Sequence, residues 1–213
     1  MWAKVRTLGR MSHGAMPLTG VNPMYHMARL LVELKKLEAA EIAALGVDPF
    51  LGRPSISPTA LRAPVEGAGE EQANVIPAVC RATLDIRLIP GQSAEDMEAK
   101  IHAIFGRLAA EDPTFQAELE IVESRPPTAT AKTEPVVQAL VSAIRDVAGH
   151  EPVYGGVPGT TDGTILNHWA GVPIVTCGPG NIHIPHHVDE YLEIDQLTEA
   201  AKLYAVTALR YLA

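Results

Sequence analysis

Only two cysteines, Cys80 and Cys177, occur in the 213 residues. Neither lies in a CxxC or another spacing typical of metal ligands, which favours a reducing compartment over a disulfide-stabilised secreted domain. Long apolar runs are also missing: no stretch approaches the roughly 18 consecutive apolar residues of a membrane span, and residues 1–6 contain no apolar segment of a signal peptide. We therefore predict a cytoplasmic protein without a membrane partner.

Positive charge is scarce as well, since 17 Lys and Arg residues stand against 25 Asp and Glu residues and give a net charge of −8. Such a surface repels the phosphates of nucleic acids and of anionic membranes. Nucleic acid is therefore not an expected partner. Apolar residues make up 47% of the chain, which is enough for a hydrophobic core, and the length allows at most about two domains.

Hydrophobic periodicity predicts the elements of the first part of the chain. Asn22 followed by Pro23 is a typical helix start, Ser93 is another, and an apolar stripe of helical spacing follows each. Strand patterns occupy residues 4–9, 55–62, 80–88 and 115–121. The order predicts an α+β fold over residues 1–124, a split βαβ (ferredoxin-like βαββαβ) domain with both helices on one face of an antiparallel sheet.

Residues 125–213 show a different pattern, which begins at the pair Pro126-Pro127. The segment 172–176 is apolar on both faces, so as a strand it needs neighbouring strands and helices above and below. Roughly 90 residues with two or three helices cannot supply them. We therefore expect the closing half of an α/β domain. Its predicted elements are a helix capped by Thr133, short strands at 153–154 and 172–176, and a last helix from Asp195.

Three polar segments hold residues suited to chemistry. Residues 12–17 follow the first strand and place His13 among small residues, a pattern that is also typical of a surface-loop histidine. Residues 155–163 are a glycine-rich turn, which suits either an anion on backbone N–H groups or a plain tight turn. Residues 178–190 contain several histidines and two acids after the apolar segment 172–176, which favours a metal site.

Several short motifs occur in an order typical of one enzyme family. They are the segments 9–23, 74–77, 85–91, 159–163, 178–180 and 186–191. With them the chain resembles, over nearly its whole length, the zinc-dependent acetylornithine deacetylase and succinyl-diaminopimelate desuccinylase family of amidohydrolases and exopeptidases. The resemblance implies that residues 1–124 are a lid or dimerisation domain. It implies that residues 125–213 are the carboxy-terminal portion of an α/β zinc-exopeptidase catalytic domain.

The resemblance also assigns roles to individual residues. His186 matches the family's carboxy-terminal zinc ligand. His13 matches the lid histidine that, in dimeric members, reaches into the neighbouring subunit's active site and donates a hydrogen bond to the oxyanion of the tetrahedral intermediate. A homodimer through the lid domain is therefore implied. The implied substrate-binding residues are Asn74 and Arg87 in the lid and Gly159 and Thr160 in a turn that binds the substrate carboxylate.

The family site holds two metal ions, and its imidazole and carboxylate ligands suit zinc, cobalt and manganese alike. This chain supplies one matching ligand, His186. The family's other ligands and its catalytic base lie in an amino-terminal segment with a His-x-Asp motif and a Glu-Glu pair. Residues 187–189 and 70–71 match these two motifs in residue type. Neither follows an apolar strand that would direct its side chains into a site, so we interpret both matches as coincidence. We therefore expect the chain by itself to be inactive or to need a companion.

The leading hypothesis is a metal-dependent hydrolase of the amidase, deacylase or exopeptidase type that acts on an N-acyl amino acid or a small peptide. An alternative from another class is a non-catalytic dimerisation or ligand-binding protein derived from that family. A third is an anion-binding regulatory domain. An apolar strand followed by His-x-Asp and Glu-Glu upstream of residue 1 would favour the enzyme, and its absence would favour the binding protein.

Overall fold

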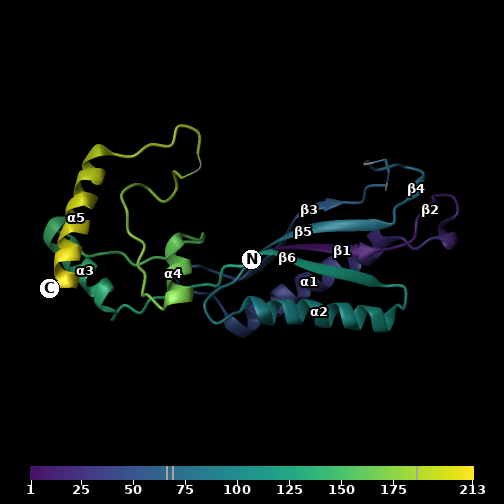
Figure 1. Cartoon of the computed structure of the whole chain (residues 1–213), viewed down its shortest axis with the longest axis horizontal. Helices are drawn as coiled ribbons and strands as arrows, with labels where there is room; N and C mark the ends of the chain where they lie inside the picture. Colours follow the sequence, from purple (N-terminus) through teal and green to yellow (C-terminus); the bar gives the residue numbers. More distant parts are fainter. Residues whose placement is uncertain (66, 69, 186) are drawn as a thin grey trace. The chain divides into compact units, whose positions relative to one another are not determined.

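The computed structural model describes residues 1–65, 67–68, 70–185 and 187–213. The chain divides into two compact units, Met1–Pro127 and Thr128–Ala213, and Figure 1 shows their helices and strands. No helix in the described part of the chain is both long enough and apolar enough to cross a bilayer. Both cysteines are free thiols, one in each unit.

The first unit is built on one four-stranded antiparallel sheet. Its strands are β1 (Trp2–Leu8), β3 (Ser55–Arg62), β5 (Val79–Arg87) and β6 (Gln116–Glu123). They lie in the order β3-β5-β1-β6, and α1 (Pro23–Leu45) and α2 (Ala94–Glu111) connect them. Two further short strands, β2 (Ser12–His13) and β4 (Val75–Ile76), pair only with each other. The structure therefore confirms the α+β prediction of a split βαβ domain.

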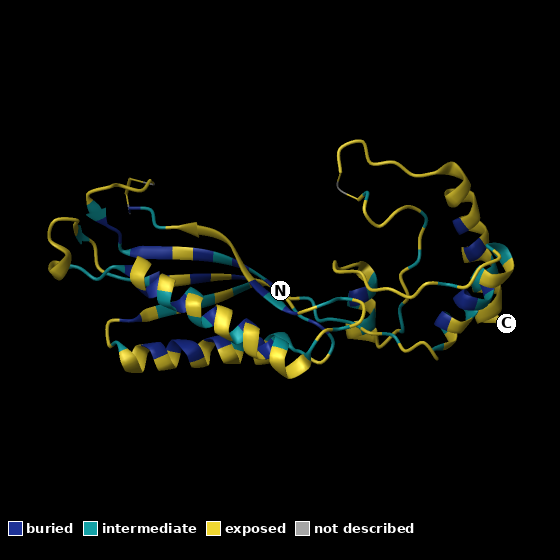
Figure 2. Cartoon of the chain, turned by 180° about the vertical axis from the view of Figure 1, so that it is seen from behind, coloured by how far each residue is buried: buried dark blue, intermediate teal, exposed yellow. Residues whose placement is uncertain are grey.

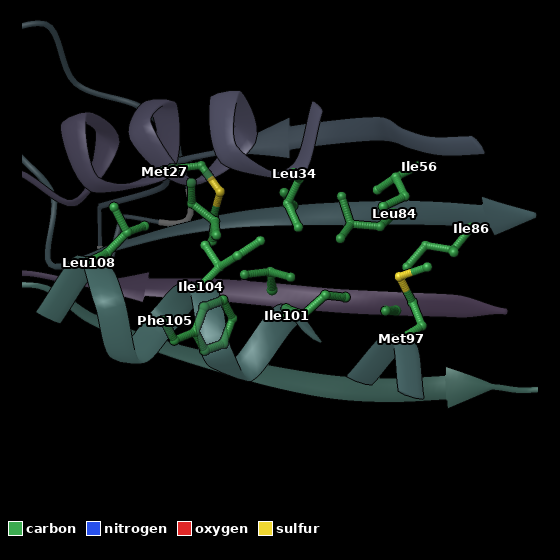
Figure 3. Packing of buried hydrophobic residues seen from close by; sticks show 14 of the residues in the cluster. Met27, Leu34, Ile56, Leu84, Ile86, Met97, Ile101, Ile104, Phe105 and Leu108 are labelled. Atoms are coloured by element: carbon green, nitrogen blue, oxygen red, sulfur yellow. The ribbon is translucent and has the colours of Figure 1, made fainter. Parts of the chain in front are cut away.

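Burial alternates along β1, β5 and β6, so one face of the sheet is covered and the other is more exposed. In β1, Ala3, Val5 and Thr7 are buried, whereas the residues between them are exposed. Figure 2 shows the same alternation along the sheet, and α1 and α2 pack on its covered face. Each fully buried Leu or Ile contributes about 1.5–3 kcal/mol. The core contains Met27, Leu34, Ile56, Leu84, Ile86, Met97, Ile101, Ile104, Phe105 and Leu108 (Figure 3).

Both helices of the sheet begin where the sequence predicts. The Asn22 side chain accepts a hydrogen bond of 2.9 Å from the N–H of Met24, and Pro23 is the first helical residue of α1. The Ser93 hydroxyl accepts a 3.0 Å hydrogen bond from the N–H of Asp96 at the start of α2. These side chains accept hydrogen bonds from backbone N–H groups that have no partner within the helix. Because capping depends on the type of residue, both helix starts can be predicted from the sequence.

Two carboxylates of α1 lie buried against the rest of the unit. Glu38 pairs with Lys35 and accepts a 2.7 Å hydrogen bond from the backbone N–H of Ile56 in β3. Burial raises the pKa of Glu38, but these two partners outweigh it and hold the pKa below the usual 4.5. Burial likewise opposes ionisation of Glu41, whose pKa is also lowered because Lys100 and Gln92 donate to it at 2.7 and 2.8 Å.

We expect the first unit to lose stability as the pH falls below about 4.5, because the folded pKa values of Glu38 and Glu41 lie below that unfolded value. Their stabilisation is complete above it and is lost as each carboxylate is protonated at lower pH. Urea unfolding between pH 3 and 7 measures this. Glu38→Gln and Glu41→Gln should each cost about 1–3 kcal/mol at neutral pH and flatten the acid slope. Glu71→Gln, at an exposed position, is the control and should leave the slope unchanged.

The described residues of the second unit form three helices. They are α3 (Pro135–Val147), α4 (Asp162–Ala170) and α5 (Ile194–Leu212). α3 packs against α5, with Leu140 and Val141 buried on α3 and Leu203 buried on α5. Arg210 of α5 also donates a 2.9 Å hydrogen bond to the hydroxyl of Ser142 on α3. These contacts form a small core on one side of each helix.

Four predictions for this unit differ from the structure, namely two strands, one helix cap and one helix start. Residues 153–154 and 172–176 are not strands, and Val153 is 96% exposed. A strand requires a partner for its backbone groups, and no strand occurs among the described residues of the second unit. The cap of α3 is Glu134 rather than Thr133, because Pro135 is the first helical residue. The last helix begins at Ile194, one residue before the predicted start.

Candidate active-site residues

His13 and Asn74 lie together at one end of the sheet of the first unit. β2 pairs antiparallel with β4 so that His13 is opposite Val75. The N–H of Gly14 donates a 2.7 Å hydrogen bond to the carbonyl oxygen of Asn74. Both His13 and Asn74 are exposed. The pairing of two short strands therefore brings together residues that are far apart in the sequence.

The segment that carries His13 is closed at its base. Arg10 and Val21 exchange backbone hydrogen bonds of 2.9 and 3.0 Å. A Cβ atom at Gly9 would lie 2.2 Å from the carbonyl oxygen of Val21, and one at Gly20 would lie 2.2 Å from the Ser12 hydroxyl oxygen. Since no larger side chain fits this approach, the two glycines allow the loop to close. We call residues 9–21 the His13 loop.

The ring of His13 accepts a hydrogen bond within this loop. The N–H of Ala15 donates a 3.1 Å hydrogen bond to Nδ1 of His13. The carbonyl oxygen of His13 accepts a 2.8 Å hydrogen bond from the N–H of Met16. The loop therefore orients the imidazole through Nδ1. The sequence pattern showed small residues after His13 but did not indicate this contact.

Arg87 lies at the other end of the same sheet. It ends β5, and its guanidinium donates a 2.8 Å hydrogen bond to Asp85 on the same face of that strand. β5 has nine residues. A strand of that length measures roughly 26 Å at about 3.3 Å per residue. The structure therefore separates Arg87 from His13 and Asn74 within one copy.

Asp85 contacts the candidate residue Arg87, and the sequence interpretation gave it no role. Its carboxylate holds Arg87 on one side, and its other oxygen is buried without a hydrogen bond among the described residues. Aspartate and arginine two residues apart on a strand point to the same face. This spacing in the sequence could have indicated that Asp85 contacts Arg87.

Gly159 and Thr160 lie in the second unit, directly before α4. Both are exposed, and Thr161 is the residue that caps the helix, without a capping bond from its side chain. Backbone N–H groups at a helix start favour a carboxylate. A hollow of about 460 Å³ adjoins this start. It is lined by Val136, Thr161, Gly163, Pro173, Ile174, Val175, Thr176 and Cys177.

The predicted metal ligand, His186, lies outside the described residues. Its neighbours His183 and His187 are described and exposed, and the backbone N–H of His183 donates a 2.9 Å hydrogen bond to the Asn181 side chain. Among the described residues, no group of three or more His, Cys, Asp or Glu side chains is placed to hold a metal ion. A catalytic zinc takes about three protein ligands. The described residues by themselves therefore do not fit a metal centre.

We expect the 213-residue chain to bind zinc only weakly. One imidazole at the proposed ligand position, His186, even with help from His183 or His187, offers too few ligands to replace the water around a divalent ion. Isothermal titration calorimetry of the chain with zinc should show no tight stoichiometric site. A nanomolar site that His186→Ala removes and His150→Ala leaves intact would show that the chain builds its own metal centre.

The first unit belongs to the class of two-layer α+β domains, with a histidine loop at one end of its sheet. Residues 1–113 match the family model M20_dimer, described as "Peptidase dimerisation domain". The chain belongs to this family of M20 peptidase dimerisation domains. The match confirms the family resemblance inferred from the motifs.

Two curated relatives extend the similarity beyond that domain. The chain is 31% identical over 203 residues to a succinyl-diaminopimelate desuccinylase of Azoarcus sp. (strain BH72), covering 95% of this chain and 49% of the relative. It is 26% identical over 203 residues to an acetylornithine deacetylase of Myxococcus xanthus, covering 95% of this chain and 50% of the relative. The chain thus spans about half the length of the curated relatives it matches.

Solved structures share the fold. An M20 family metallo-carboxypeptidase from Sulfolobus solfataricus aligns with a TM-score of 0.67 and 16% identity, covering 100% of this chain and 59% of that structure. The dipeptidase Dug1p from Saccharomyces cerevisiae aligns with a TM-score of 0.67 and 15% identity, covering 99% of this chain and 53% of that structure. At these identities the similarity shows the fold.

Proposed function

We propose that this chain is the substrate-binding portion of a metal-dependent hydrolase of the amidase, deacylase or exopeptidase type. Its proposed substrate is an N-acyl amino acid or a small peptide. The pairing of β2 with β4 carries the proposal, because it presents His13 beside the Asn74 segment on an exposed end of the sheet. The names of the two curated relatives, a desuccinylase and a deacetylase, support the same reaction class.

In this proposal the candidate residues have separate roles toward the substrate, and His13 and Arg87 are taken from different copies of the chain. His13 donates a hydrogen bond to the carbonyl oxygen as negative charge develops there, and Asn74 helps to hold the substrate. Arg87, oriented by Asp85, binds a carboxylate with two parallel hydrogen bonds. The backbone at Gly159 and Thr160 adds N–H groups for a carboxylate.

A divalent metal, zinc or else cobalt or manganese, is part of the proposal because a bound metal ion can activate water for amide hydrolysis at neutral pH. His186 is the proposed ligand from this chain. The remaining ligands of a two-ion site are proposed to come from a segment equivalent to the other half of the relatives. We place the enzyme in the cytoplasm because its two cysteines are free thiols.

We further propose a homodimer that forms through the first unit. β3 is an edge of the sheet, and α1 packs beside it. That border is apolar, since Tyr25 and Val32 of α1 and Leu61 of β3 are 72%, 56% and 58% exposed. The other edge strand, β6, carries Glu118 and Glu120 on its exposed face. Two copies would therefore pair through β3 and α1, because this edge presents exposed apolar side chains that an interface can bury.

Val32→Glu is expected to weaken this dimer by about ten- to a hundredfold in Kd. When the burial of one valine side chain in the interface is lost, the free energy of association falls by about 1.5–3 kcal/mol, which corresponds to that factor. Analytical ultracentrifugation at micromolar concentration measures it. Val122→Glu is the matched control, since Val122 is 48% exposed on the opposite edge strand. A wild-type chain that stays monomeric at these concentrations would contradict the proposed dimer.

The function is tested on the completed enzyme, which we define as residues 1–213 joined to the amino-terminal half of the Azoarcus relative. Release of the acyl group from N-succinyl-diaminopimelate, from N-acetylornithine and from dipeptides is measured with added zinc. Hydrolysis of one of these substrates is the expected result. A folded, zinc-loaded protein that hydrolyses none of them would favour a non-catalytic dimerisation or ligand-binding protein.

A further inference from the structure

The backbone after His13 makes three successive hydrogen bonds, and one of them ends on the imidazole. Gly14 donates to Asn74 at 2.7 Å, Ala15 donates to Nδ1 of His13 at 3.1 Å, and Met16 donates to the His13 carbonyl oxygen at 2.8 Å. The first and third bonds fix the backbone on both sides of Ala15. The direction of the Ala15 N–H is therefore set by the fold of the loop.

A backbone N–H can only donate, so the imidazole nitrogen that it meets must be the acceptor. A neutral imidazole has one nitrogen with a proton and one without. Since Nδ1 accepts from Ala15, the proton lies on Nε2. The opposite tautomer would place an N–H on Nδ1 against the N–H of Ala15, so the hydrogen bond between them could not form.

We infer that the Ala15 N–H is a positioning group that holds neutral His13 as the Nε2–H tautomer, so that His13 meets its ligand as a hydrogen-bond donor. The ligand atom that fits is a carbonyl oxygen or an oxyanion. A proton acceptor or a metal ligand at Nε2 would require the other tautomer. The identity of the ligand as a scissile carbonyl rests on the proposed function, whereas the tautomer is a property of the loop alone.

The loop keeps this arrangement without help from a ligand. The Arg10 guanidinium donates a 3.1 Å hydrogen bond to the Thr19 carbonyl oxygen, and the Thr19 hydroxyl donates a 2.8 Å hydrogen bond to the Met16 carbonyl oxygen. Together with the bonds between Arg10 and Val21, these contacts connect the two sides of the His13 loop. The donor nitrogen is thus oriented before a ligand arrives, which lowers the cost of ordering it on binding.

The test uses the 213-residue chain labelled with ¹⁵N. Long-range proton–nitrogen spectra at a pH where the ring is neutral report which imidazole nitrogen carries the proton, and His13→Gln identifies the His13 signals by their loss. The direct measurement is the scalar coupling across the hydrogen bond between the Ala15 amide nitrogen and Nδ1 of His13. We expect this coupling in the neutral ring and its loss when acid protonates Nδ1.

Ala15→Pro removes the N–H, so the fraction of the Nδ1–H tautomer should rise at least about threefold, whereas Ala15→Gly keeps the N–H and should match the wild type. Unchanged amide signals from α1 and α2 show that the variant is folded. If the proline variant does not fold, the inference is tested by the coupling between the Ala15 amide and Nδ1 of His13 in the wild type. Absence of that coupling, or an Nδ1–H tautomer in the wild type, would overturn the inference.

The same variants separate this inference from the proposed function. In the completed enzyme, Ala15→Pro should lower turnover by about ten- to a hundredfold with KM nearly unchanged, the range for a slightly misplaced catalytic group. Ala15→Gly should keep most of the turnover. The chain can show the inferred coupling and tautomer while the turnover of the completed enzyme does not depend on His13. That result would refute the proposed role of His13 but would leave the tautomer assignment unchanged.

Discussion

Replacement of His13 by Ala is expected to lower the turnover of the completed enzyme by about a hundred- to a thousandfold, the usual effect of removing one donor to a developing oxyanion. The donor acts as charge develops, so kcat should fall much more than KM changes. Steady-state kinetics with the best N-acyl amino acid measures both constants. The unchanged assembly of the variant is checked by ultracentrifugation.

His102→Ala is the matched control for this prediction. His102 is an exposed histidine of α2, and its ring contacts Phe105 at 5.5 Å between ring centres. Its loss should leave turnover within about twofold, as for most exposed positions. If His13→Ala and His102→Ala had equal turnover, His13 would not be an oxyanion donor.

Mixing two variants of the completed enzyme tests whether two copies share a site. Within one copy, β5 separates His13 from Arg87 by roughly 26 Å, at about 3.3 Å per residue, so one small substrate cannot touch both. A site that uses both residues therefore takes them from two copies. Mixing His13→Ala with His186→Ala should restore up to about a quarter of the wild-type activity, because half of the dimers are mixed and each has one intact site. No recovery despite demonstrated subunit exchange would refute this sharing.

Hydrolysis is expected only when the half of the relatives that this chain does not match is also present. The 213-residue chain alone should release no acyl group, because its described residues gather no group of three metal ligands. Addition of the amino-terminal half of the Azoarcus relative, joined or in trans, should produce zinc-dependent hydrolysis. The assay compares the chain, the added half and their mixture at equal concentrations.

Two controls make this comparison decisive. The added half with its His-x-Asp histidine replaced by Ala should remain inactive in the mixture, and His186→Ala should lower both the zinc content and the turnover of the completed enzyme. Robust hydrolysis by the unextended chain, retained after treatment with a chelator and reloading with zinc, would refute the claim that it needs a companion.

The sequence by itself determined the architecture of the first unit. Alternating burial in β1 follows a period of two, and the side chains of Asn22 and Ser93 cap the helices through neighbouring N–H groups. These signals are local, since each depends on a few residues that are close together in the sequence. The family motifs added the dimerisation domain, which the match over residues 1–113 confirms.

Only the tertiary structure decided the pairing and separation of the site residues. His13 and Asn74 meet because β2 pairs with β4, and a pairing between distant segments leaves no periodic signal in either one. The same cause explains the error at 172–176, whose apolar composition is that of a buried strand although no described strand of its unit lies beside it. Composition sets what a segment can bury, but its partners decide whether it becomes a strand.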